Sequence, residues 1–324
     1  MTSRGSPLHS GVLAGVRSGW RGFLWMAEIV IPVSLAVALL QWSGVLDKAD
    51  AVLAPLMSFL RLPPEAAFPI ISGMLVNIYA VLAALTVMHF SLAQMTLIAI
   101  FSLIAHNFIL EGIVQHRSGV NVFRMTAVRL GAAIVTVFLV SRFFSGTAES
   151  VGLNGALTPH MAIPNVLKTW ASSTGTLLLK IFGIIVLIMV ALEISKAMGW
   201  MTHVNRVFKP LMKAFGLADR ATTAFVAGIV FGLLYGGAVI VEEAKKGVLT
   251  RRDARNLQVT LAINHAMIED PALFAALGVN LVWLIVPRLV TAIVAVQAIR
   301  GAEAVFGKRQ KRTLDGSGRL LSDS

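Results

Sequence analysis

The chain has 324 residues, of which 56% are hydrophobic and only 14% charged, and its mean hydropathy is +0.79. This composition excludes an ordinary soluble globular protein and indicates an integral membrane protein. The formal net charge is +12, and the sequence has no aromatic and basic module of the kind that binds nucleic acid. We therefore expect these charges to set the orientation in the membrane or to contact anionic lipid, and not to bind nucleic acid. The absence of cysteine excludes disulfides, thiolate metal sites and cysteine nucleophiles.

Eight apolar stretches follow one another along the chain, and those at 22–41, 126–143, 174–197 and 279–298 are long enough to span a bilayer as continuous helices. The other four lie at 66–88, 93–110, 221–241 and 256–277. Alternation of period two is absent, so helices and not a barrel must satisfy the backbone in lipid. The first stretch is too long for a signal-peptide core, and we expect it to be retained. The predicted fold class is an all-α integral membrane protein.

The chain repeats itself. The segment Pro55-Leu56-Met57 matches Pro210-Leu211-Met212 at an offset of 155, and after four extra residues in the second copy the matches continue at an offset of 159. Paired halves are typical of secondary transporters, whose site lies where the repeats meet. The further matched pairs are Gly73 with Gly228, His106 with His265, Glu111 with Asp270 and Arg129 with Arg288. The predicted organisation is an N-terminal segment (1–19), a first repeat (20–145), a linker (146–167), a second repeat (168–300) and a basic tail (301–324).

The distribution of lysine and arginine predicts the topology. If all eight stretches span, the inner loops hold six of these residues and the outer loops eight, against the positive-inside rule. If 66–88 and 221–241 are re-entrant, the inner loops hold eleven and the outer loops three. We therefore expect two inverted repeats, each with about three spanning helices plus one re-entrant or broken helix. Both termini are then cytoplasmic, in a bacterial inner membrane.

Glycines punctuate both re-entrant candidates. Gly228, Gly232 and Gly236 recur every four residues in the second, where they indicate either a broken helix or a ridge for close helix packing. Asn77 and Tyr235 lie in these elements and could bond a ligand or serve the core.

A cluster of polar groups stands among the apolar segments. On a helix His265 and Glu269 would share a face, with Asn264 and Asp270 adjacent to them. The first half has Asn107 and Glu111 at the same spacing, next to His106. Ionisable groups at membrane depth are costly and mark an ion or substrate path. Three interpretations stay open: a structural network with Arg288, a proton-coupling or polar-substrate site, and a divalent-cation site using His265 and Glu269.

Four further charged residues are less specific. Glu242 and Glu243 precede two lysines and belong either to the site or to a solvated face at the cytoplasmic edge. Arg129 and Arg288 are expected to set the depth of their spans, with substrate binding as the alternative.

Enzyme motifs are missing. The sequence has no phosphate loop, no His-Glu-x-x-His and no Gly-x-Ser-x-Gly, which excludes an ATP-driven pump within this chain. Ser102 near His106 is the one pairing that an intramembrane hydrolase could use. We expect a protein that is not an enzyme and needs no cofactor.

The duplication, the Tyr235-Gly236-Gly237 to Glu242-Glu243 segment and the segment from Asn264 to Asp270 resemble bacterial membrane proteins with a duplicated nucleoside-recognition or Gate domain. That superfamily is similar to the spore maturation proteins A and B, to the membrane core of FeoB-type ferrous iron transporters and, more distantly, to concentrative nucleoside transporters. The resemblance covers about 20–300 and implies inverted gate repeats and transport, without naming a substrate. The chain departs from the FeoB type in having no GTPase domain and no cysteine.

We therefore expect a permease for a small polar or ionic solute, such as a nucleoside, an organic anion or a divalent cation. The alternative is a non-transporting scaffold of the spore-maturation kind. Expected partners are the bilayer, the solute and, in a homo-oligomer, further copies of the chain.

Overall fold

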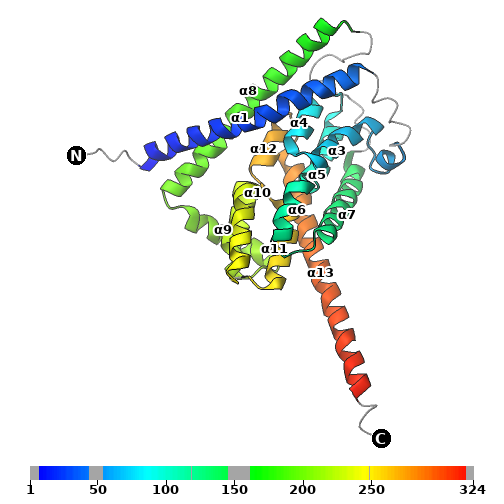
Figure 1. Ribbon diagram of the computed structural model, residues 1–324, viewed down its shortest axis with the longest axis vertical. Coiled ribbons are helices and arrows are strands. Elements are labelled where there is room, and N and C mark those ends of the chain that lie inside the picture. The colour runs from blue at the N-terminus through cyan, green and yellow to red at the C-terminus, as the bar shows by residue number, and fades with distance from the viewer. Residues whose placement is uncertain (1–6, 44–53, 118, 145–160, 248, 319–324) are drawn as a thin grey trace, which may run out of the picture.

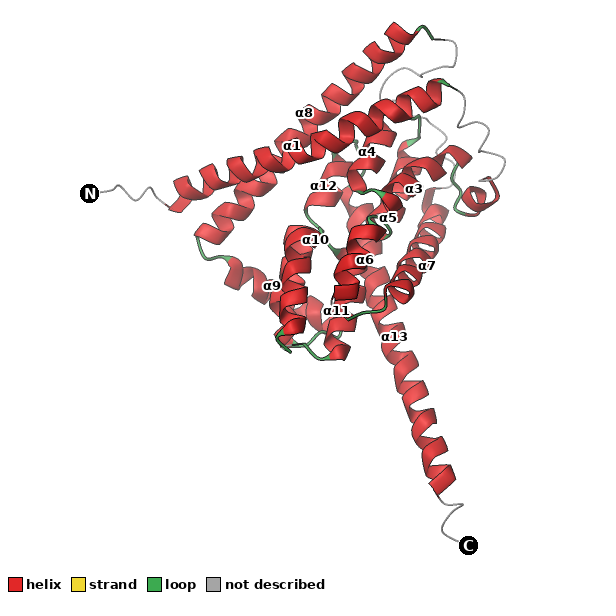
Figure 2. Ribbon diagram, viewed as in Figure 1, coloured by secondary structure: helices red, strands yellow, loops and turns green. Residues whose placement is uncertain are grey.

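The computed structural model describes residues 7–43, 54–117, 119–144, 161–247 and 249–318. Within these ranges all regular structure is helical (Figure 2). Two long helices, α1 and α8, lie side by side along one edge of the molecule, and the shorter helices pack together below them (Figure 1). The predicted all-α class is confirmed.

The first half of the chain contains six labelled α-helices and two 3₁₀ turns among the described residues. The helices are α1 (Pro7–Trp42), α3 (Ala67–Leu75), α4 (Ile78–Val87), α5 (Leu92–Ile104), α6 (Phe108–Arg117) and α7 (Val122–Val140), and the turns are η1 (Pro64–Ala66) and η2 (Ser141–Phe144).

The second half follows the same order. Its elements are α8 (Ile163–Ala197), α9 (Met201–Ala214), η3 (Asp219–Ala221), α10 (Thr222–Lys245), α11 (Arg251–Asn264), α12 (Glu269–Ala275) and α13 (Leu281–Gly318). The last of these projects away from the packed helices toward the C-terminus (Figure 1).

The same local hydrogen bonds occur in each half, at positions related by the sequence offsets of the repeat. The amide of Leu62 donates to Met57, and the amide of Leu217 donates to Met212. Farther along, α5 begins at a capping box on Ser91 and α11 begins at a capping box on Thr250. Two copies of one local design therefore fold alike, although few of their residues are identical.

The helices α1 and α8 approach so closely that only glycine fits on the α1 face. A Cβ atom on Gly11, Gly15 or Gly19 would meet backbone atoms of Ile194, Val190 and Val186 respectively. Since the residue number rises along α1 as it falls along α8, the two helices run antiparallel. At the other end of the contact, the indole Nε1 of Trp170 donates to Ser34 Oγ at 3.0 Å.

Both re-entrant candidates are broken helices. The first is divided at Val76 and Asn77 into α3 and α4, and the Asn77 side chain caps α4 by accepting from the amides of Tyr79 and Ala80. In the second, α10 is broken at Gly232, whose φ of 70° and ψ of −165° suit glycine alone. Gly228 instead serves packing, because its Cβ would lie 2.6 Å from Leu261 Cδ1. Gly232 thus allows the helix to break and Gly228 allows close packing, so both of the roles expected for these glycines occur.

Two stretches predicted as full spans, 93–110 and 256–277, are also divided. The first breaks between α5 and α6, and the second breaks between α11 and α12. Their apolar composition hid the breaks, because the freed backbone groups are satisfied by residues distant in sequence.

Among the described residues, five segments are long and apolar enough to cross a membrane: Leu8–Trp42, Leu92–Arg117, Val122–Phe144, Ile163–Ala197 and Leu281–Ala302. The helices extend past the predicted boundaries. α1 begins within the N-terminal segment 1–19, α8 begins within the linker 146–167, and α13 continues into the tail 301–324. With 36 and 35 residues, α1 and α8 are about 50 Å long, well beyond the roughly 30 Å hydrocarbon thickness.

The close contact of α1 with α8 predicts that one added methyl group on α1 lowers the stability of the protein. In Gly15→Ala the new Cβ would lie 2.4 Å from Val190 Cα, and backbone atoms cannot move aside as a flexible side chain can. We expect the free energy of unfolding to fall by about 1–3 kcal/mol, as in other overpacked sites. Thermal unfolding in detergent measures the change. Gly183→Ala on α8 is the matched control, because its Cβ would meet nothing within 4 Å; equal stability of the two variants would contradict the packing described.

Candidate functional site

Two helix breaks bring His106 and His265 together in the interior. His106 follows the end of α5 and His265 follows the end of α11, and both are buried. The next residues, Asn107 and Ala266, have φ of 56° and 48°, a left-handed conformation that costs a non-glycine residue of order 1–3 kcal/mol. Their amides donate to Gly73 and Gly228 respectively, so each break is tied to the broken helix of its own half.

Two buried arginines donate hydrogen bonds to the backbone carbonyls at the two helix breaks. On α7, Arg129 donates from Nε to Ile104 O (2.9 Å) and from Nη2 to His106 O (2.8 Å). On α13, Arg288 donates in the same pattern to Ile263 O (3.1 Å) and His265 O (3.0 Å). The exposed fraction of Arg129 is 1% and that of Arg288 is 0%.

The role predicted for these arginines needs correction. We expected them to set the depth of their spans near a membrane edge, but both guanidinium groups bind carbonyls that the helix breaks leave free. A carbonyl without a partner is costly away from water. The planar fork of arginine satisfies two carbonyls at once.

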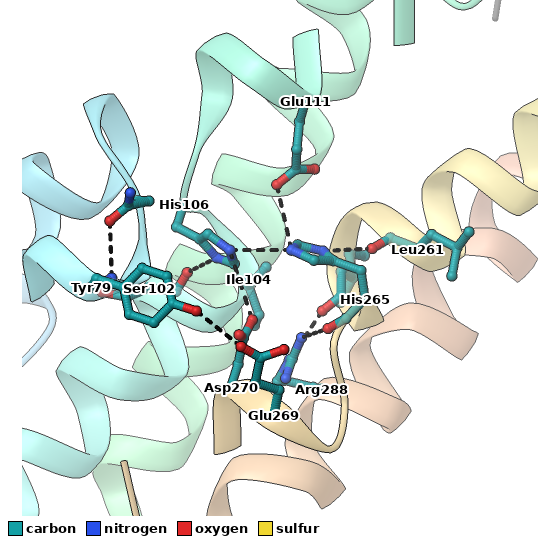
Figure 3. Close-up of polar contacts among 12 residues, drawn as sticks. Tyr79, Ser102, Ile104, His106, Glu111, Leu261, His265, Glu269, Asp270 and Arg288 are labelled. Atoms are coloured by element: carbon teal, nitrogen blue, oxygen red, sulfur yellow. Dashed lines mark hydrogen bonds and ion pairs between the residues drawn. The ribbon is translucent and has the colours of Figure 1, made fainter. Parts of the chain in front are cut away.

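The two imidazole rings face one another through Nε2, at 3.1 Å (Figure 3). The opposite ring nitrogens are held by the backbone: His106 Nδ1 lies 2.7 Å from Ser102 O, and His265 Nδ1 lies 2.9 Å from Leu261 O. Since a carbonyl oxygen only accepts, both Nδ1 atoms carry the proton. In neutral rings both Nε2 atoms are then bare and present lone pairs to one another.

A carboxylate lies near each ring, but the two are held differently. Glu111 Oε1 is 3.8 Å from His265 Nε2 and forms an ion pair with Arg129 Nη2 at 2.7 Å. Asp270 Oδ2 is 3.9 Å from His106 Nε2 and has no hydrogen-bond partner among the described residues. The matched positions predicted from the repeat therefore meet at the ring pair, and the aspartate is the less constrained of the two.

The prediction that His265 and Glu269 share the face of one helix is wrong, because α11 ends at Asn264 and α12 begins only at Glu269. The Glu269 side chain instead accepts a hydrogen bond from Tyr79 Oη at 2.9 Å. The Tyr79 ring packs edge-on against Trp25 of α1, with the centroids 5.6 Å apart.

A cavity of about 100 Å³ adjoins the rings. It is lined by residues of both halves, including four predicted site residues beyond the histidines, which are Asn77, Asn107, Glu269 and Asp270. Trp25 and Tyr79 also line it. Trp25 carried no signal in the sequence, because α1 meets this region only through the tertiary fold.

Asn264 does not line the cavity. It is fully buried, and neither polar atom of its side chain has a hydrogen-bond partner among the described residues. Glu242 is exposed and pairs with Lys246 at 2.6 Å, and the hydrogen bond from this lysine lowers the pKa of Glu242. Neither Glu242 nor Glu243 lines the cavity. The side chain of Tyr235 lies outside the described residues.

Ser102 and His106 do not form the nucleophile and base pair that an intramembrane hydrolase would need. The backbone carbonyl of Ser102 holds the His106 ring, and Ser102 Oγ has no hydrogen-bond partner in the described part of the chain.

Comparison with known proteins places the chain among membrane proteins. The model of the family described as Gate, nucleoside recognition, matches residues 23–147 and 178–293, one segment in each half. The chain is 26% identical over 291 residues to the uncharacterized membrane protein YvoD of Bacillus subtilis (strain 168), which covers 89% of this chain and 93% of that protein. No solved structure matches the chain.

The buried ion pair predicts that substitutions of Arg129 and Glu111 have non-additive effects on the free energy of unfolding. Arg129→Met removes the donor from two backbone carbonyls and leaves a carboxylate without its cation, so we expect the free energy of unfolding to fall by about 3–5 kcal/mol. In Arg129→Met/Glu111→Leu the unpaired charge is gone, and the loss should be smaller than that of the single arginine variant. Unfolding in mixed detergent micelles measures all three. Arg124→Met, at an exposed position of the same helix, is the control. If Arg129→Met lowers the free energy of unfolding no more than Arg124→Met does, the ion pair is contradicted.

Proposed function

The chain belongs to the Gate nucleoside-recognition family and is a multi-pass membrane protein, and on this basis we propose that it is a secondary transporter of a small polar or ionic solute. The observation that carries the proposal is the buried ring pair. Two histidines and two carboxylates meet where broken helices of both halves adjoin a cavity. Ionisable groups of this kind in a membrane interior are costly and mark an ion or substrate path.

The arrangement of the halves supports alternating access. The corresponding helices α1 and α8 run antiparallel, as expected when one repeat is inverted relative to the other. In transporters built this way the site lies between the repeats near the bilayer midplane and is formed by discontinuous helices. Both properties fit the position of His106 and His265, one from each half. Movement of one half against the other would expose the site to each side in turn.

We further propose a location in the bacterial inner membrane with both termini in the cytoplasm. The loops that this topology places inside carry most of the lysine and arginine of the connecting segments. Two of these loops are joined by an ion pair between the half-exposed Arg220 and the buried Asp253 at 2.7 Å, which supports their lying on one side of the membrane.

Transport is tested in proteoliposomes that contain the purified chain. The probes are tritiated uridine, labelled citrate and radioactive zinc, one for each expected solute class. For the probe that accumulates, we expect Glu269→Gln and His265→Ala to abolish uptake while the folded protein remains in the membrane. Both residues line the cavity, and each loses its charge or its ring.

Glu242→Gln is the matched control, because this glutamate is exposed, pairs with a surface lysine and does not line the cavity. It should keep the uptake of the unmodified protein. Full activity of both cavity variants would overturn the proposed site. If none of the probes accumulates, and none stabilises the protein against heat, the scaffold alternative is favoured over transport.

A further inference from the structure

We propose that His106, His265 and Asp270 form a binding site for one divalent transition-metal cation between the two halves. The inference rests on the proposed function only for what the ion does after binding. The site itself is argued from the arrangement of donor atoms.

The two rings present the atoms that a metal needs. Both Nδ1 atoms donate to backbone carbonyls, so both Nε2 atoms of the neutral rings offer a lone pair at a separation of 3.1 Å. Two lone pairs at this distance repel unless a cation lies beside them. Zinc binds histidine nitrogen at about 2.0–2.1 Å, so two nitrogens 3.1 Å apart can bind one ion.

A third donor lies within reach. One ligand atom from each of His106, His265 and Asp270 lies within 4.8 Å of the other two, and all three residues are buried. Within the described part of the chain Asp270 Oδ2 has no hydrogen-bond partner, so it can bind an ion without breaking a bond seen there. Glu111 is close to His265 but is already paired with Arg129, and we assign it a balancing charge instead of a place among the ligands.

The surroundings hold the rings in position. Metal-binding histidines usually donate their other ring N–H to a carbonyl or carboxylate, which fixes the tautomer and the ring orientation. Here the carbonyls of Ser102 and Leu261 accept these protons. The backbones of the two histidines are fixed in turn by Arg129 and Arg288. This is a rigid frame around two free nitrogens.

The charges also favour a cation. Two arginines and three carboxylates, those of Glu111, Glu269 and Asp270, surround the neutral ring pair. When the carboxylates are ionised, one negative charge remains uncompensated. A divalent ion would more than offset it in an environment of low dielectric constant, where an unpaired charge is costly.

The donor set selects the class of ion. Imidazole nitrogen suits zinc, iron, cobalt, nickel and copper, whereas magnesium and calcium require oxygen ligands. The adjoining cavity of about 100 Å³ exceeds the roughly 10–15 Å³ that one water molecule needs, so water can complete the coordination. We therefore expect a partly hydrated first-row ion.

The test uses the full chain in detergent with its purification tag removed, and zinc and cobalt as probes. Equilibrium dialysis should show one ion bound per chain, and X-ray absorption of the zinc-loaded protein should show two imidazole nitrogens at about 2.0–2.1 Å. Magnesium and calcium should not compete. Absence of saturable zinc and cobalt binding would overturn the site, as expected if a shared proton instead lies between the rings.

Variants locate the ion. His106→Gln and His265→Gln should each lower zinc affinity more than about 100-fold, since loss of an outer partner alone costs about 10- to 100-fold. Asp270→Asn keeps the shape of the side chain and should also weaken binding. His116→Gln, which changes an exposed histidine of α6, is the matched control and should bind as the unmodified protein does. Unchanged binding in the first three variants would place the ion elsewhere and overturn the assignment.

The metal-binding and transport experiments can contradict the metal site and the proposed transport independently of one another. Zinc binding at the rings without uptake of any probe would support the metal site and contradict the proposed transport. Uptake of uridine or citrate without zinc or cobalt binding would support transport and contradict the metal site.

Discussion

The structure depends on two buried arginines that bind backbone carbonyls at helix breaks. Within a membrane, a helix can break only where other groups satisfy its freed carbonyls. Arg129 does this for Ile104 and His106, and Arg288 does it for Ile263 and His265, in the same geometry. Each break turns a histidine out of its helix and toward the centre. The two chain segments thus become half-sites that only the folded pair of repeats can complete.

The halves are alike in backbone and different in chemistry. In the first, Glu111 neutralises Arg129, so that the charge of this arginine is used within its own half. In the second, α12 begins two residues later relative to its counterpart, and Asp270 is turned toward the ring of His106. Symmetry therefore brings the two nitrogens together, and the departure from symmetry leaves one carboxylate free beside them. A symmetric frame with one unequal ligand suits a site that holds a single ion or polar group.

Much of this was predictable from the sequence, for identifiable reasons. Hydropathy predicted the helical class, and the repeat offset paired His106 with His265 and Glu111 with Asp270 before any contact was known. The breaks in 93–110 and 256–277 were not predictable, because their apolar residues read as uninterrupted helices while the compensating arginines lie 23 to 25 residues away. The packing glycines of α1 were missed because residues 1–19 were read as lying outside the fold. Their meaning depends on α8, whose partner residues are more than 160 positions distant.

The site depends on two histidines that face each other through unprotonated Nε2 atoms. Nitrogen NMR of the protein with isotope-labelled histidine measures this protonation state, with His106→Gln and His265→Gln used to assign the two rings among the seven histidines of the chain. At neutral pH we expect both rings to carry the proton on Nδ1 and none on Nε2, and we expect replacement of either histidine to shift the Nε2 signal of the other. The proton on Nε2 in both rings, or an Nε2 signal of one histidine that does not shift when the other is replaced, would contradict this arrangement.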